Sequence, residues 1–168
     1  MAHSPHPEIG LLLENLDRAY DAASWHGTNL RGSIRGLRLD VVAWRPGPGR
    51  HNVWELAVHC AYWKYTVRRR LTGEKRGSFP LRGSNFFARP EAGRAPAAAD
   101  WKRDVALLDE MHRTLRATVA ELPARRLAEV TEGAKVPNRD VLLGIAAHDL
   151  YHAGQIQLLK RLARSRRR

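Results

Sequence analysis

The stretch Ala147-His148-Asp149-Leu150-Tyr151-His152-Ala153-Gly154-Gln155 places two histidines four residues apart in a segment compatible with a long helix. Residues i and i+4 of an α-helix lie on one face, about 5–6 Å apart at Cβ, so their side chains can bind one metal ion together. The stretch can therefore supply two ligands of a metal site.

The two histidines also belong to an apolar stripe. Its members recur at intervals of three and four residues, as on the inward face of an amphipathic helix: Val141, Ile145, His148, His152, Ile156, Leu159 and Ala163. A chain with eight histidines can contain one such pair by chance, so the spacing alone is weak. Two buried imidazoles, however, need a partner for each ring nitrogen, and a metal ion would satisfy one nitrogen of each ring.

A first helix is predicted over about residues 8–36, where apolar residues recur every three or four positions. Gly27 and Gly32 are candidate positions for a break or a kink in it. The segment Arg45-Pro46-Gly47-Pro48-Gly49 cannot continue a helix and predicts a tight connection.

A second helix is predicted over residues 52–72, with Asn52 as its N-cap and Glu55 three residues later as a variant of the capping box. Two more amphipathic patterns predict helices over residues 100–122 and 138–164. Each of the four helices has an apolar face that another helix can cover.

A long connection, residues 73–99, joins the second and third helices and is rich in Gly, Pro, Ser, Arg and Ala. Its apolar residues favour an ordered crossover over a disordered strap; they are Phe79, Leu81, Phe86 and Phe87. Four helices, one long crossover and no alternating strand pattern predict an all-α four-helix bundle. The length of 168 residues favours a single domain, 1–168.

The formal net charge of +12 suggests nucleic-acid binding at first, with arginine clusters at residues 68–70 and in a basic tail, 164–168. The basic residues are nevertheless spread over nearly every segment, and no nucleic-acid-binding motif is present, so solvated helix faces are favoured. We expect an anionic or other small-molecule substrate and a homodimer, rather than a nucleic-acid or membrane partner. An apolar run long enough for a signal or membrane segment is missing from the sequence, which predicts a cytoplasmic protein. The lone cysteine, Cys60, is interpreted as a packing residue.

The pattern His148-Asp149-x-x-His152 approaches the H-E-x-x-H motif of zinc metalloproteases, but two features separate it from them. Asp149 is one methylene shorter than the glutamate that acts as general base. The residues after His152 contain no His, Asp, Glu or Cys that could serve as a downstream ligand. The third ligand must therefore come from upstream.

His59 is the leading candidate, because it lies between Leu56 and Trp63 on the apolar stripe of the second helix. In a bundle this stripe faces the interior, as the stripe of the last helix does. His26, beside Gly27, is the reserve ligand.

Two motifs carry a resemblance to a known family: Trp54-Glu55-Leu56-x-x-His59-x-Ala61-x-Trp63 and His148-x-x-x-His152-Ala153-Gly154-Gln155-Ile156. With these motifs the chain resembles, over almost its whole length, the DinB-like (damage-inducible) metalloproteins. The resemblance implies a helical bundle that holds a divalent metal, usually zinc or nickel, through His59, His148 and His152. Members of the family include transferases that activate low-molecular-weight thiols such as bacillithiol, mycothiol or glutathione, a thiol-dependent isomerase, and proteins interpreted as hydrolases.

Three functions remain open from the sequence. Three imidazole ligands leave a fourth position of a tetrahedral metal open, which suits a thiol transferase or a hydrolase. Asp149 lies about 100° around the helix from His148 and could act as the hydrolytic base, orient a ligand ring, or form a surface ion pair. A noncatalytic metal-binding protein of the stress response is the third possibility.

The candidate substrate-binding residues are Tyr62, Trp63, Asn85, Phe86 and Arg89. Aromatic residues at helical spacing more often belong to a core than to a pocket. The crossover that carries Asn85, Phe86 and Arg89 is predicted to close over the metal.

Overall fold

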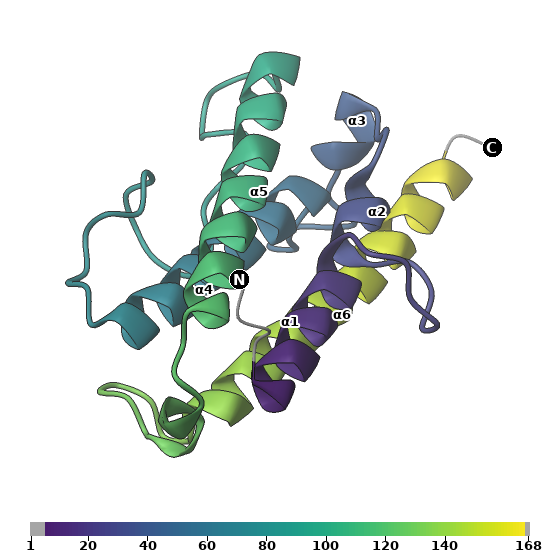
Figure 1. The fold of residues 1–168 in the computed structure, drawn as a ribbon. Coiled ribbons are helices and arrows are strands. Elements are labelled where there is room, and N and C mark those ends of the chain that lie inside the picture. Colours follow the sequence, from purple (N-terminus) through teal and green to yellow (C-terminus); the bar gives the residue numbers. More distant parts are fainter. Residues whose placement is uncertain (1–5, 167–168) are drawn as a thin grey trace.

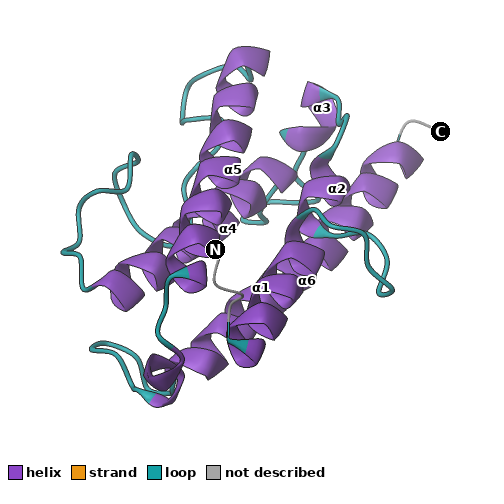
Figure 2. Cartoon of the chain, in the orientation of Figure 1, coloured by secondary structure: helices purple, strands orange, loops and turns teal. Residues whose placement is uncertain are grey.

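The structure is a computed structural model that describes residues 6–166; residues 1–5 and 167–168, including the end of the predicted basic tail, lie outside the described part. Its helices are α1 (Pro7–Tyr20), α2 (Leu30–Ile34), α3 (Leu39–Val42), α4 (Val53–Thr72), α5 (Ala98–Ala120), the 3-10 helix η1 (Ala124–Ala128) and α6 (Asn138–Ser165). No strand occurs within residues 6–166 (Figure 2), so the all-α fold class is confirmed. The four long helices are α1, α4, α5 and α6.

Each of the four long helices packs against two of the others. Helix α4 packs against α5 and α6, while α1 packs against α6 and α5, as the ribbon in Figure 1 shows. The first and last long helices thus lie side by side and enclose the core with the two central ones. None of the helices in the described part of the chain is long and apolar enough to cross a membrane.

The first helix is shorter than the sequence predicts, since it ends at Tyr20 instead of about residue 36. The chain then turns, with Gly27 in the left-handed region at φ 99°, and restarts a short helix at residue 30. Asn29 fixes this restart: its Oδ1 accepts a hydrogen bond from Gly32 N at 2.7 Å, and its Nδ2 donates to Ala22 O at 2.8 Å. The prediction of one helix over 8–36 is therefore wrong, because α2 buries its apolar residues in the same core and so continues the apolar pattern across a break.

Helix α4 begins with the predicted capping box. Asn52 Oδ1 accepts a hydrogen bond from Glu55 N at 2.8 Å, and Glu55 Oε2 accepts one from Asn52 N at 3.4 Å. The same two side chains hold the crossover, because Asn52 Nδ2 donates to Arg89 O at 2.6 Å and Arg89 N donates to Glu55 Oε1 at 3.2 Å. The start of α4 thereby sets the position of the crossover segment that precedes Arg89.

The crossover from α4 to α5 packs on the surface of α4. Phe79 and Phe87 place their rings 5.3 and 5.6 Å from the ring of Tyr62. Phe87 is buried, and its contacts with Trp54 and Val58 make it part of a small apolar cluster. The apolar anchors therefore act as the sequence predicts and hold the crossover down.

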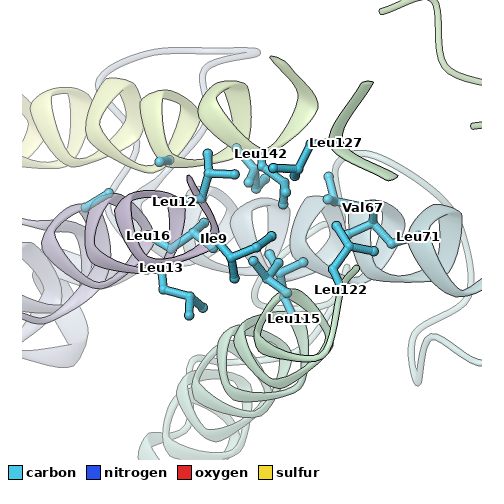
Figure 3. Packing of buried hydrophobic residues seen from close by; sticks show 14 residues of the cluster. Ile9, Leu12, Leu13, Leu16, Val67, Leu71, Leu115, Leu122, Leu127 and Leu142 are labelled. Atoms are coloured by element: carbon cyan, nitrogen blue, oxygen red, sulfur yellow. The ribbon is translucent and has the colours of Figure 1, made fainter. Parts of the chain in front are cut away.

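The largest apolar cluster joins all four long helices. Figure 3 shows its side chains pointing toward one another; the labelled members are Ile9, Leu12, Leu13, Leu16, Val67, Leu71, Leu115, Leu122, Leu127 and Leu142. A second cluster contains Leu56 of α4 with Ile156 and Leu159 of α6. This second contact sets α4 against α6 at the level of the histidines described next.

Candidate metal centre

The three histidines that the sequence predicts as ligands meet between α4 and α6. His59 Nε2 lies 3.0 Å from His148 Nε2, and His148 Nε2 lies 3.1 Å from His152 Nε2. The three residues offer ligand atoms within 4.8 Å of one another, a grouping that could hold a metal ion. Two adjacent turns of α6 and the middle of α4 thus supply one compact set of nitrogen donors.

The outer hydrogen bonds of two of the rings fix where their protons lie. His59 Nδ1 donates to Asn85 O at 2.9 Å, and His152 Nδ1 donates to Gln155 Oε1 at 2.7 Å. Each of these neutral rings therefore turns a bare Nε2 lone pair toward His148. A single proton on His148 Nε2 can satisfy only one of the two. A divalent cation between the rings would accept all three lone pairs, so this donor set fits a metal.

Burial keeps these imidazoles in the neutral form that metal ligation requires. It lowers the pKa of His59 to about 4 and the pKa of His148 to about 3, and repulsion between the neighbouring rings acts in the same direction. Burial also lowers the pKa of His152, against the opposing effect of its bond to Gln155. At neutral pH the rings are free to coordinate without first losing a proton.

A pocket of about 640 Å³ opens beside the three rings. Phe86 forms one wall and is stacked between two imidazoles, with ring centroids 3.7 Å from His51 and 4.0 Å from His59. The residues that line the pocket are mostly apolar or aromatic and include no carboxylate; they are Pro46, Arg50, His51, Leu56, His59, Trp63, Asn85, Phe86, His148, Tyr151, His152, Gln155, Leu158 and Leu159. Such a site suits a small organic ligand that reaches the three nitrogens.

Asn85 connects the crossover to the histidines through an unusual backbone conformation. Its φ of 65° lies in the left-handed region, which asparagine tolerates better than most residues. In this conformation its main-chain oxygen accepts the bond from His59, and its Oδ1 accepts a bond from Trp63 Nε1 at 3.0 Å. The crossover thus orients His59 as well as forming part of the pocket.

Of the predicted substrate-binding residues, Trp63, Asn85 and Phe86 line this pocket, but Tyr62 and Arg89 do not. Tyr62 lies on the neighbouring face of α4, where its ring packs against Phe79 and Phe87. Arg89 is buried, and its Nε donates to Asp104 at 2.6 Å. In this structure Tyr62 packs against the crossover and Arg89 anchors it to α5, so neither reaches the pocket at the histidines.

The reserve ligand, His26, does not join the cluster. It is exposed in the turn after α1, and its Nδ1 lies 3.4 Å from Ser24 Oγ. The break in the predicted first helix carries it away from α4 and α6, so among residues 6–166 it is His59 that completes the set.

Asp149 lies in the interior of the bundle, which excludes two of the three roles that the sequence suggests. It is fully buried, forms an ion pair with the equally buried Lys64 of α4, and is absent from the pocket lining. Neither a surface ion pair nor a base acting on a pocket substrate is compatible with this position. Burial raises the pKa of Asp149 to about 6, although Lys64 opposes the rise.

Sequence reasoning missed Lys64, Gln155 and His51. Lys64 is the only charged residue between Glu55 and Arg68, and this isolation within an apolar helix was the available signal for a buried charge. Gln155 follows His152 by three residues, a helical spacing at which side chains meet.

Fold and site together define a class: an all-helical bundle whose second and last long helices bring three histidines to the edge of a pocket. The family model of the DinB superfamily matches residues 22–156, which include all three histidines, and the chain belongs to that superfamily. Neither a curated protein nor a solved structure matches the chain.

Proposed function

We propose that this protein is a metal-dependent transferase that uses a low-molecular-weight thiol, with zinc or nickel bound by His59, His148 and His152. The observation that carries the proposal is the meeting of three Nε2 atoms at the edge of a pocket without carboxylates. When bound there, a divalent metal supplies a coordination position open to the pocket and lowers the pKa of a thiol that occupies it.

The residues around the pocket suit a thiol that carries negative charge. Arg50 lies at the pocket, and no ion pair involves it among the described residues, so its guanidinium is available for a carboxylate of the thiol. Phe86 and Trp63 provide aromatic walls that hold an organic electrophile and exclude water. In the transfer, the thiol sulfur forms a bond to the electrophilic carbon, the leaving group departs from that carbon, and the thiol proton passes to water.

A hydrolase needs a general base near the reacting water, and the pocket supports this alternative less well. Its described lining includes no Asp or Glu, and Asp149 is engaged by Lys64 outside it. A thiol ionises far more readily than water and has less need of such a base, which favours thiol transfer.

The first test is the metal content of the purified protein and of His59→Ala, measured by inductively coupled plasma mass spectrometry. We expect stoichiometric metal in the wild type and its loss in His59→Ala, because a two-histidine remnant binds weakly. His26→Ala is the matched control, since His26 is exposed and outside the cluster. Equal metal content in wild type and His59→Ala would contradict the site.

The second test measures thiol transfer directly. Metal-loaded protein is incubated with monochlorobimane and, separately, bacillithiol, mycothiol or glutathione, and the fluorescent conjugate is followed. We expect turnover with at least one thiol that disappears after chelation and in His59→Ala. Stoichiometric metal without turnover for any thiol would instead support a noncatalytic metal-binding protein.

A further inference from the structure

His148 differs from the other two histidines in its outer hydrogen bond. Asn85 O and Gln155 Oε1 accept the Nδ1–H of His59 and His152. His148 Nδ1 is buried and has no hydrogen-bond partner in the described structure. A buried ring nitrogen without a partner is costly, and metal-bound histidines nearly always donate this second N–H to an oxygen.

An acceptor without a donor lies next to this ring. Asp149 Oδ1 is buried and has no partner among the described residues, while its Oδ2 accepts from Lys64. A ring nitrogen of His148, a carboxylate oxygen of Asp149 and Cys60 Sγ all lie within 4.8 Å of one another. Because His148 Nε2 is directed at the other two histidines, Nδ1 is the nitrogen left for Asp149.

We propose that Asp149 is a positioning residue for the metal site: it accepts a hydrogen bond from Nδ1–H of His148 and so turns Nε2 toward the metal. The inference rests on the proposed metal site and gives the third histidine the outer oxygen that its two neighbours already have. The two unpartnered atoms belong to residues of α6 that already bring a ring nitrogen and a carboxylate oxygen within 4.8 Å of each other.

Lys64 is the second part of this arrangement. Its ammonium group is fully buried on α4 and pairs with Oδ2 of Asp149, which leaves Oδ1 for the histidine. A buried ion pair is weak evidence for stability alone, because apolar residues of similar size often replace it without loss. Its contact with the carboxylate beside a candidate ligand gives it a purpose: Lys64 holds Oδ2 of Asp149 in place, and the free Oδ1 can then accept from His148.

The same residues could instead form a second metal site from Cys60, His148 and Asp149. Two observations disfavour it. The positive charge of Lys64 already neutralises Asp149, and burial raises the pKa of the Cys60 thiol, which opposes formation of the thiolate. The arrangement therefore serves the three-histidine site and binds no ion of its own.

The test compares two double variants that both remove the buried charge pair, Lys64→Met/Asp149→Leu and Lys64→Met/Asp149→Asn. Both replace the pair with neutral groups of similar size, so folding is retained, but only the asparagine keeps an acceptor oxygen. A competition titration with Zn²⁺ and a chelating dye should give a dissociation constant roughly 10- to 100-fold weaker for the leucine variant. The asparagine variant should recover most of that loss. Equal affinity in wild type and both variants would overturn the inference, as would a second equivalent of Zn²⁺ that Cys60→Ala removes.

A spectroscopic measurement on the wild type remains decisive even if a double variant fails to fold. In the Co²⁺-loaded protein, each metal-bound imidazole gives an exchangeable, paramagnetically shifted Nδ1–H resonance. We expect all three to exchange slowly with solvent, and the His148 signal alone to exchange faster in the leucine variant. A His148 proton that exchanges rapidly in the wild type, or lies on Nε2, would contradict the proposal. Loss of metal from wild type overturns the proposed function itself, whereas bound metal with an unprotected His148 overturns only the role of Asp149.

Discussion

His59, His152 and His112 are buried and His148 is half-buried, yet only the three clustered histidines have the geometry of a metal site. His112 of α5 is 6% exposed, and burial lowers its pKa to about 3, as it does for His148. Its ring stacks on Tyr20 with centroids 3.8 Å apart, and among the described residues it belongs to no group that could hold a metal. Burial and a neutral ring are therefore common to both regions, and the meeting of bare Nε2 atoms distinguishes one of them.

The hollows beside the two regions support the same conclusion. The one at His112 is larger, about 800 Å³, but two of its three acidic residues, Asp17 and Asp109, are already paired. Arg116 binds Asp17 at 2.7 Å, and Arg31 binds Asp109 at 2.8 Å. The smaller pocket at the cluster has no such internal ion pairs and leaves its nitrogens unsatisfied. Ring nitrogens that are available as metal ligands, and not the volume of the cavity, identify the metal site.

The largest predicted difference between the two regions is the loss of bound metal when a histidine is removed. His148→Ala should abolish stoichiometric zinc or nickel binding, because His148 Nε2 lies within 3.1 Å of both other Nε2 atoms. His112→Ala should keep its metal and show only a lower melting temperature, from the lost contact with Tyr20. Metal analysis and thermal unfolding of both variants check this. A folded His112→Ala protein without metal, or a His148→Ala protein with metal, would show that the meeting of the three Nε2 atoms does not determine metal binding.

A second prediction uses the pH dependence of stability in the metal-free protein. Because the folded pKa of His112 is about 3 and the unfolded value is about 6.5, the unfolded state binds a proton first as the pH falls. The contribution of His112 to the free energy of unfolding is therefore fully present above pH 6.5 and is lost progressively between pH 6.5 and about pH 3. At pH 4 the loss from this one ring amounts to about 3 kcal/mol.

The control for this prediction is His112→Leu, which removes the titrating ring but keeps an apolar side chain. Urea unfolding at pH 7 and pH 4 should show a smaller loss of stability on acidification in this variant than in wild type. Some loss should persist, because His59 and His148 also have lowered pKa values. An unchanged difference between the two pH values would mean that His112 is not held neutral by burial.

The sequence predicted those parts of the molecule that depend on local pattern. The capping box at Asn52, the helix that carries His148 and the ordered crossover all follow from residues close in the chain. The end of α1 at Tyr20 did not, because α2 continues the apolar pattern in a separate helix that lines the same core. The pairing of Lys64 with Asp149 could not be predicted either, since it depends on which faces of α4 and α6 meet in space.

The smallest effect concerns Gln155, whose Oε1 accepts from His152 Nδ1 at 2.7 Å. Gln155→Leu should weaken Zn²⁺ binding about 10-fold, the lower end of the range for removing an outer hydrogen-bond partner of a metal ligand. Gln155→Glu keeps an acceptor and adds a negative charge behind the ring, so its affinity should equal or exceed that of wild type. Gln155 contacts His152 and lies outside the region of His112. Neither Gln155 variant should therefore alter the acid-induced loss of stability that we assign to His112. A competition titration measures the change in Zn²⁺ affinity, and urea unfolding at two pH values measures the acid-induced loss of stability. An equal loss of affinity in both Gln155 variants would mean that the Gln155 side chain acts by packing and not by accepting the hydrogen bond from His152.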